Sequence, residues 1–179
     1  MKKLITLAVV VLAFIAAPQA NAQKFPDLQK SPTDIAYAKV DRRAKPTIKV
    51  IYSRPQKKGR TIFGELVPFG KVWRTGADEA TEIKLMQDYN FGGKTVKAGT
   101  YSLFTIPGEK EWTIILNSDL DSWGAYSYKE DMDVARITVP VGKAENTVEA
   151  MGIGFKPVDK GYHLVLGWDN TIVEVPFYN

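Results

Sequence analysis

The sequence predicts an all-β protein, a single antiparallel β-sandwich (jelly-roll-like or a partly closed barrel) of about eight or nine strands. Three observations support this fold class. Short runs of alternating apolar and polar residues recur from residue 33 onward, and turn-forming residues separate them. No window of ten or more residues carries a convincing helical period. Without helices to form crossover connections, such strands pair antiparallel.

The first half of the chain contains four of the expected strands. Residues 47–52 and 81–86 alternate between apolar and polar side chains. Residues 100–106 are rich in β-forming residues and stop at Pro107-Gly108, which is a strong turn signal, and residues 111–117 then alternate again. The last two runs therefore predict a hairpin.

The second half continues the same pattern. Residues 133–141 and 147–155 are strand candidates, and residues 161–168 alternate cleanly. Asp169-Asn170 follows, and both residue types tolerate the positive φ of tight hairpin turns. We therefore predict a hairpin between residues 161–168 and 171–177.

The N-terminus has the three parts of a secretory signal peptide. Lys2 and Lys3 precede an uncharged, mostly apolar run over residues 4–17, and Ala20-Asn21-Ala22 offers the small residues that signal peptidase requires. The run of 14 residues is shorter than the roughly 20 that cross a bilayer. We expect cleavage between Ala22 and Gln23, no lipidation because the junction has no cysteine, and a periplasmic or secreted protein without a membrane span.

Removal of the predicted signal peptide (residues 1–22) leaves 179 − 22 = 157 residues. We expect a flexible lead-in over residues 23–32 and one β-sandwich domain over residues 33–179. A domain of this size buries about 70% of its unfolded surface, and without cysteine its stability depends on the core. With no cysteine and only His163, thiolate and multi-histidine zinc sites are excluded, and we predict no metal and no cofactor.

Charge is unevenly distributed along a chain whose net charge is +4. Residues 39–60 hold nine basic residues and one acid, whereas residues 109–133 hold seven acids and two lysines. These segments can be solvated faces that partly complement each other, or the first can be a patch that attracts anions. Nucleic acid is a poor partner for an exported protein whose charges nearly balance.

Three motifs resemble a known family. They are YSRPQKKGRTIFGELVPFGKVWRTGADEAT (residues 52–81), AGTYSLFTIPGEKEWTIILN (residues 98–117) and SWGAYSYKED (residues 122–131). Together they resemble an exported bacterial family known as domain of unknown function 2911, over nearly the whole mature chain. The resemblance implies no particular activity, so no catalytic residue follows from it.

The connection over residues 52–81 holds most of the candidate binding residues. Arginine offers a planar fork that matches a carboxylate or phosphate, and tryptophan offers a flat apolar face to a sugar ring or a cation. We therefore predict a site for an anionic or carbohydrate-like ligand formed by Arg54, Lys58, Arg60, Trp73, Arg74, Asp78, Glu79, Trp123 and Tyr126.

The same residues also have a purely structural interpretation. The arginines and acids can pair internally to hold the connection, with Trp73 in the core. Trp123 and Tyr126 can form a stacking platform for a glycan or fill the edge of the sandwich. We expect a mixture, in which Arg54 and Arg74 are anchored to acids. The basic residues expected to remain free are Lys57, Lys58 and Arg60.

Two further patterns are weak. Residues 119–130 partly match the spacing of a calcium-binding loop, but Trp123 occupies a position that must carry a ligand. His163 lies in the middle of a predicted strand, where a lone histidine is more often structural than catalytic. Neither pattern predicts a metal site or a reaction.

The leading functional hypothesis is a ligand-binding module in the cell envelope. The first alternative is an envelope hydrolase in which Asp78 or Glu79 is the acid–base group and Arg74 holds an anion. The second alternative is a structural or assembly protein without a small ligand. The oligomeric state is left open.

Overall fold

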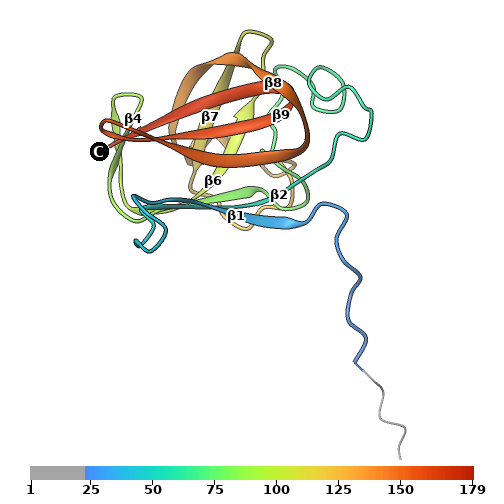
Figure 1. Ribbon diagram of the computed structural model, residues 1–179, viewed down its shortest axis with the longest axis horizontal. Coiled ribbons are helices and arrows are strands. Elements are labelled where there is room, and N and C mark those ends of the chain that lie inside the picture. The colour runs from blue at the N-terminus through green and yellow to red at the C-terminus, as the bar shows by residue number, and fades with distance from the viewer. Residues whose placement is uncertain (1–22) are drawn as a thin grey trace, which may run out of the picture.

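The computed structural model describes residues 23–179 as a mostly β structure (Figure 1). The predicted signal peptide, residues 1–22, lies outside the described residues. Residues 23–32 form no regular secondary structure, and most of them are exposed. Within residues 23–179, the only helical piece is a 3-10 turn at Glu130–Met132, and no helix is long and apolar enough to span a membrane.

Nine strands form one antiparallel sheet, which confirms the predicted fold class. The order across the sheet is β1-β2-β3-β6-β7-β8-β9-β4-β5, and the sheet does not close on itself. The strands are β1 (Thr33–Ala38), β2 (Ile48–Ser53), β3 (Thr81–Leu85), β4 (Tyr89–Phe91), β5 (Lys94–Val96), β6 (Gly99–Ile106), β7 (Glu111–Asn117), β8 (Asp133–Val158) and β9 (Gly161–Tyr178).

The C-terminal half differs from the sequence prediction. The four strands predicted in this half of the chain are two long strands in the structure. Each of these, β8 and β9, continues through a polar stretch that suggested a break between two strands. The predicted hairpin at Asp169-Asn170 is wrong, and the chain instead reverses between Val158 and Gly161. Asp169 does have the positive φ that its residue type allows, 55°, but it lies within β9.

Irregular pairing explains how two such long strands bend. Lys143 pairs with Thr171 and Val148 with Asp169, so five steps along β8 face only two along β9. A second register shift follows between Val148 and Gly152. Bulges of this kind bend a sheet and increase its twist. The turn-forming residues near position 170 therefore mark a bend of the sheet and not a reversal of the chain.

The strands of the first half agree with the prediction to within a residue at each end. Three strands were missed: β1, β4 and β5. The last two have three residues each, which is too short for a pattern of period two to be recognised. They form a hairpin across Gly92-Gly93 at the far edge of the sheet, beside β9, where Asn90 pairs with Tyr178.

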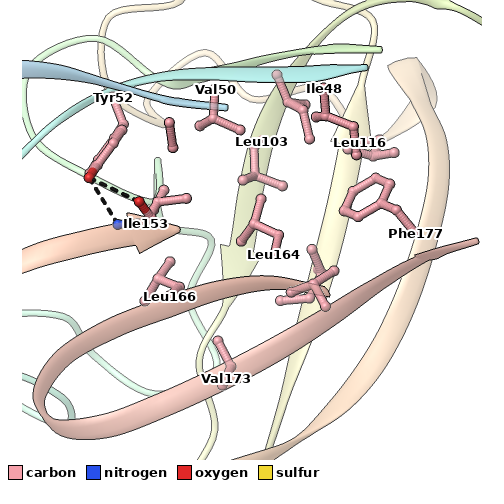
Figure 2. Packing of buried hydrophobic residues seen from close by; sticks show 14 of the residues in the cluster. Ile48, Val50, Tyr52, Leu103, Leu116, Ile153, Leu164, Leu166, Val173 and Phe177 are labelled. Carbon is pink, nitrogen blue, oxygen red and sulfur yellow. Dashed lines mark hydrogen bonds between the residues drawn. The ribbon is translucent and has the colours of Figure 1, made fainter. Parts of the chain in front are cut away.

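The bent sheet folds into two facing layers that enclose the core. Figure 1 shows β8 and β9 passing over β1 and β2, with β6 and β7 linking the two levels. In Figure 2 Val50 of β2 points into the core opposite Leu164 and Leu166 of β9, with Leu103 of β6 between them. All four side chains are buried. The apolar side chains of the alternating runs in β2 and β9 are thus the ones that form the core.

Side chains at the end of β2 join it to β8 across the core. The Ile153 amide donates to the Tyr52 hydroxyl at 2.9 Å, and that hydroxyl lies 3.4 Å from the Ile153 carbonyl (Figure 2). Burial raises the pKa of Tyr52, so its hydroxyl stays protonated at neutral pH. The Arg54 Nε donates to the Met151 carbonyl at 2.9 Å.

Backbone hydrogen bonds extend this junction beyond the end of β2. The Met151 amide donates to the Pro55 carbonyl at 2.9 Å, and the Lys57 amide donates to the Glu149 carbonyl at 2.7 Å. Gln56 and Ala150 form an antiparallel bridge. We call the contacts of residues 55–57 with residues 149–151 the β2–β8 junction. It fixes the start of the connection between β2 and β3 against the opposite layer.

Removing the Tyr52 hydroxyl should destabilise the fold. Tyr52→Phe leaves the buried Ile153 amide without a partner, and we expect the free energy of unfolding to fall by about 1–3 kcal/mol. Urea unfolding followed by tryptophan fluorescence measures the change. Tyr37→Phe is the control, because that ring is exposed and its hydroxyl makes no hydrogen bond within residues 23–179. Equal stability of the two variants would contradict the role given to Tyr52.

The turn between β8 and β9 requires glycine at position 161. Gly161 has φ of 143°, and a Cβ there would lie 2.1 Å from the Phe177 carbonyl oxygen. We expect Gly161→Ala to cost about 1–3 kcal/mol of unfolding free energy, because backbone must move. The control is Gly154→Ala, where a Cβ meets no atom within 4 Å. In thermal melts, the melting temperature should fall more for Gly161→Ala than for Gly154→Ala. An equally large fall in Gly154→Ala would refute the argument.

Candidate functional site

The connection between β2 and β3 forms one wall of a cavity of about 430 Å³. This volume lies in the range of small-molecule sites. The lead-in contributes Lys30 and Ser31, and β9 contributes Trp168. We call it the basic cavity. Its lining residues are Lys30, Ser31, Pro55, Gln56, Lys58, Arg60, Leu66, Val67, Trp73, Arg74, Gly76, Ala77, Asp78 and Trp168.

An aromatic cluster forms the floor of the basic cavity. The Trp73 and Trp168 rings stack, with centroids 5.9 Å apart and planes 18° apart. Phe63 and Trp112 pack edge-on against Trp73 at 5.9 and 6.1 Å. Trp73 and Trp168 are only 7% and 1% exposed. They therefore belong to the core and at the same time limit the depth of the cavity.

Both indole N–H groups of the floor are used internally. The Trp73 Nε1 donates to the Gly76 carbonyl at 3.1 Å, and the Trp168 Nε1 donates to the Glu149 carbonyl at 3.3 Å. Each ring is therefore fixed in orientation, and neither offers its N–H to a ligand. The floor presents only apolar ring surface.

The loop after Trp73 has an unusual backbone. Thr75 has φ of 56°, which is rare for a β-branched residue. Its hydroxyl lies 3.2 Å from the Thr105 hydroxyl, and its carbonyl accepts a hydrogen bond from the Thr81 hydroxyl at 2.8 Å. Thr75 is completely buried. These contacts hold a conformation that the residue does not favour alone.

Two residues of the cavity wall share this left-handed conformation. Lys58 has φ of 49° and Asp78 has φ of 59°. With Thr75, three of the five non-glycine residues of positive φ in the described chain lie in the connection between β2 and β3. Strained backbone of this kind concentrates at functional sites, because the surrounding contacts must maintain it.

The charged residues of the cavity wall are mostly basic. Lys30, Lys58, Arg60 and Arg74 line it, against a single carboxylate, that of Asp78. Within residues 23–179, none of the four cations forms an ion pair. Like charges gathered around a partly apolar cavity create a positive potential that attracts anions.

Backbone contacts hold two of these cations at the rim. The Arg60 Nε donates to the Lys57 carbonyl at 2.9 Å, and the Lys57 ammonium donates back to the Arg60 carbonyl at 2.6 Å. The Lys58 amide donates to the Glu149 carboxylate at 2.7 Å. Lys57, predicted to be free, lies 3.4 Å from the Asp169 carboxylate and pairs with it.

Arg74 does not form the internal brace that we expected. Within residues 23–179 it makes no ion pair with Asp78, Glu79 or any other acid. Its Nε is buried and has no hydrogen-bond partner among the described residues. Arg54 does follow the expectation, since it pairs with the Asp34 carboxylate at 3.1 Å.

The structure thus brings together five of the nine predicted site residues. Arg54 lies instead at the β2–β8 junction and does not line the basic cavity. Glu79 lines a separate depression of about 290 Å³, together with Glu82 and Asp121. The predicted residues that line the basic cavity are Lys58, Arg60, Trp73, Arg74 and Asp78.

The two remaining predicted residues form an exposed aromatic pair. The Trp123 and Tyr126 rings stack with centroids 5.7 Å apart and planes 13° apart, and they are 64% and 84% exposed. Tyr126 lines a depression of about 240 Å³, which we call the side groove. The residues that the side groove shares with the basic cavity are Leu66, Val67, Trp73 and Arg74.

Hydrogen bonds tie the loop of the aromatic pair to the cavity wall. The Gly124 amide donates to the Asp78 carbonyl at 3.0 Å, and Glu79 forms an antiparallel bridge with Trp123. Further along, the Tyr128 hydroxyl donates to the Asp133 carboxylate at 2.7 Å. Burial, with that carboxylate, raises the pKa of Tyr128 to about 12, which keeps this donor protonated.

Two of the three acids of the calcium-like pattern, Asp119 and Glu130, form ion pairs within the protein. The Asp119 carboxylate lies 3.2 Å from the Lys129 ammonium, and the Glu130 carboxylate lies 3.2 Å from the Arg136 guanidinium. His163 binds the Glu174 carboxylate at 2.8 Å, on the outer side of β9. The hydrogen bond with His163, together with Lys156, lowers the pKa of Glu174.

Sequence reasoning missed the parts of the cavity that come from distant segments. Lys30 belongs to the lead-in, and Trp168 ends the alternating run over residues 161–168, far along the chain from residues 52–81. Leu66 and Val67 separate the basic cavity from the side groove, and no local pattern marked them. A sequence pattern reports neighbours along the chain, whereas this cavity depends on where the bend in β8 and β9 meets the connection after β2.

Comparison with known proteins confirms the resemblance found in the sequence. The family described as Protein of unknown function (DUF2911) matches residues 31–177. No curated protein and no solved structure matches the chain. The matched span contains β1 to β8, all of β9 except Tyr178, and all of the lining of the basic cavity except Lys30. The chain therefore belongs to the DUF2911 family.

Proposed function

We propose that this protein is a binding module for a small anionic ligand, one that carries a carboxylate, phosphate or sulfate group. The observation that carries the proposal is the basic cavity, in which four cations surround a rigid aromatic floor with one carboxylate among them. Because the predicted signal peptide directs export, we place this binding in the periplasm or outside the cell.

The cations of the basic cavity gather around a single carboxylate, which favours an anionic ligand. Arg54 and Lys57, which do not line the cavity, are instead paired with Asp34 and Asp169. The four cations of the cavity make no such pair within residues 23–179. A ligand anion would supply the missing charge in a partly dehydrated setting, where charge-assisted hydrogen bonds are strong.

Arg74 is the residue that we expect to contribute most to binding. It is half-buried beside Trp73, whose ring fixes the local backbone. Its buried Nε has no partner among the described residues, and burying a donor without an acceptor is costly. The Nε itself is closed to a ligand, but the half-buried side chain lines the basic cavity, where its guanidinium can meet a ligand oxygen. The planar fork then permits bidentate contact, which a lysine cannot make.

The alternative of a hydrolase has weaker support. Asp78 lines the basic cavity, but Glu79 is exposed and lines a different depression. The two carboxylates therefore do not face one shared space, as an acid–base pair requires. Asp78 lines the same cavity as Arg74. Its carboxylate would repel a ligand whose negative group lies close to it, so we give it a role in ligand specificity.

Arg74→Lys tests the proposal because it keeps the charge and removes the fork. We expect it to weaken anion binding about tenfold or more and to change the unfolding free energy by about 1 kcal/mol or less. Isothermal titration calorimetry with inorganic phosphate, citrate and glucuronate measures affinity, and thermal melts measure stability. Binding to the unmodified protein should weaken as salt is raised.

The matched control is Arg42→Gln. Arg42 is an exposed arginine in the turn between β1 and β2, at the other end of β2 from the cavity. The Arg42→Gln substitution should leave anion binding unchanged. If the unmodified protein gives no heat and no stabilisation with any of the three anions, the binding proposal fails and a structural role is favoured. A stability loss of about 3–5 kcal/mol in Arg74→Ala would show that Arg74 is a structural brace.

A further inference from the structure

The basic cavity and the side groove adjoin each other and share part of their lining. Leu66, Val67, Trp73 and Arg74 line both. A ligand whose acid group contacts Arg74 from the basic cavity therefore has a second depression next to its binding point. The combined surface is longer than a phosphate or a small carboxylate can occupy.

The side groove differs from the basic cavity in its chemistry. Its lining includes one further cation, Lys71, and no acid. Its remaining walls are apolar, and the exposed ring of Tyr126 forms one of them. A groove of this composition suits a ring with apolar faces that carries a negative group at its edge.

The aromatic pair is held in place although it is exposed. Tyr126 stacks on Trp123 and packs closely on Gly124, where an added Cβ would come within 2.8 Å of its ring. The Gly124 amide is bonded to the Asp78 carbonyl in the wall of the basic cavity. The aromatic pair is thus held in a fixed position relative to the basic cavity. This reduces the conformational entropy lost when one ligand contacts both.

We infer that the ligand is an acidic oligosaccharide, with one acid group at Arg74 in the basic cavity and an adjoining sugar ring against Tyr126 in the side groove. The inference rests on the proposed anion binding and extends it to a class of ligand. Sugar rings present apolar C–H faces that pack on aromatic rings, and acidic sugars repeat a negative group from ring to ring. Arg74 and Lys71 would meet two successive acid groups.

The experiment compares ligands of one and three rings. Isothermal titration calorimetry is carried out with galacturonic acid, with its linear trimer and with the neutral trimer maltotriose. We expect the acidic trimer to bind about tenfold or more tightly than the monomer, and maltotriose to bind far more weakly than the acidic trimer. Tyr126→Ala should remove the advantage of the trimer and leave the monomer affinity within about twofold.

Tyr37→Ala is the matched control, because Tyr37 is an exposed tyrosine of β1 that lines neither depression. Trp123→Ala is a second variant, which should weaken trimer binding by releasing Tyr126. Equal affinities for monomer and trimer would overturn the oligosaccharide inference while anion binding stands. Binding of phosphate or citrate without any uronate would also overturn it. Failure of every anion would overturn both proposals.

Discussion

The β2–β8 junction is the constraint on which the fold and the site both depend. Residues 55–57 run on from β2 and pair with residues 149–151, so the two layers of the bent sheet are joined at one end by backbone hydrogen bonds. The same contacts set where the connection after β2 begins. Because Lys58 follows directly and its amide is bonded to Glu149, the basic rim is positioned by the element that holds the layers together.

The aromatic floor links packing to chemistry in a second way. Trp73 stacks on Trp168 of β9 and exchanges backbone hydrogen bonds with Thr105 of β6, at 2.7 and 2.9 Å. A residue held from both layers cannot shift without disturbing the core. Arg74 is the next residue, so its backbone is as fixed as that of the tryptophan. A loop of irregular shape thereby acquires the rigidity of the sheet, which is what a precise binding site requires.

The sequence could predict the parts of this structure that depend on local alternation. The buried faces of β2, β7 and β9 follow from period two. Five residues that line the basic cavity were singled out because charged residues and tryptophan are concentrated after β2. The hairpin at Asp169-Asn170 was wrong because a positive φ serves a bulge as well as a turn. Whether Arg74 pairs with an acid depends on three-dimensional placement, which composition does not encode.

The distribution of strain and charge around the basic cavity argues that stability alone did not shape it. Left-handed φ at Lys58 and Thr75 costs of the order of 1–3 kcal/mol per residue, whereas aspartate, as at Asp78, tolerates it better. Gathering four cations around a single carboxylate adds repulsion that pairing, as at Arg54, would have removed. Both unfavourable features occur in the same connection, and both are held there by contacts with the core. An arrangement that weakens the fold and occurs at one cavity fits the binding function proposed for that cavity.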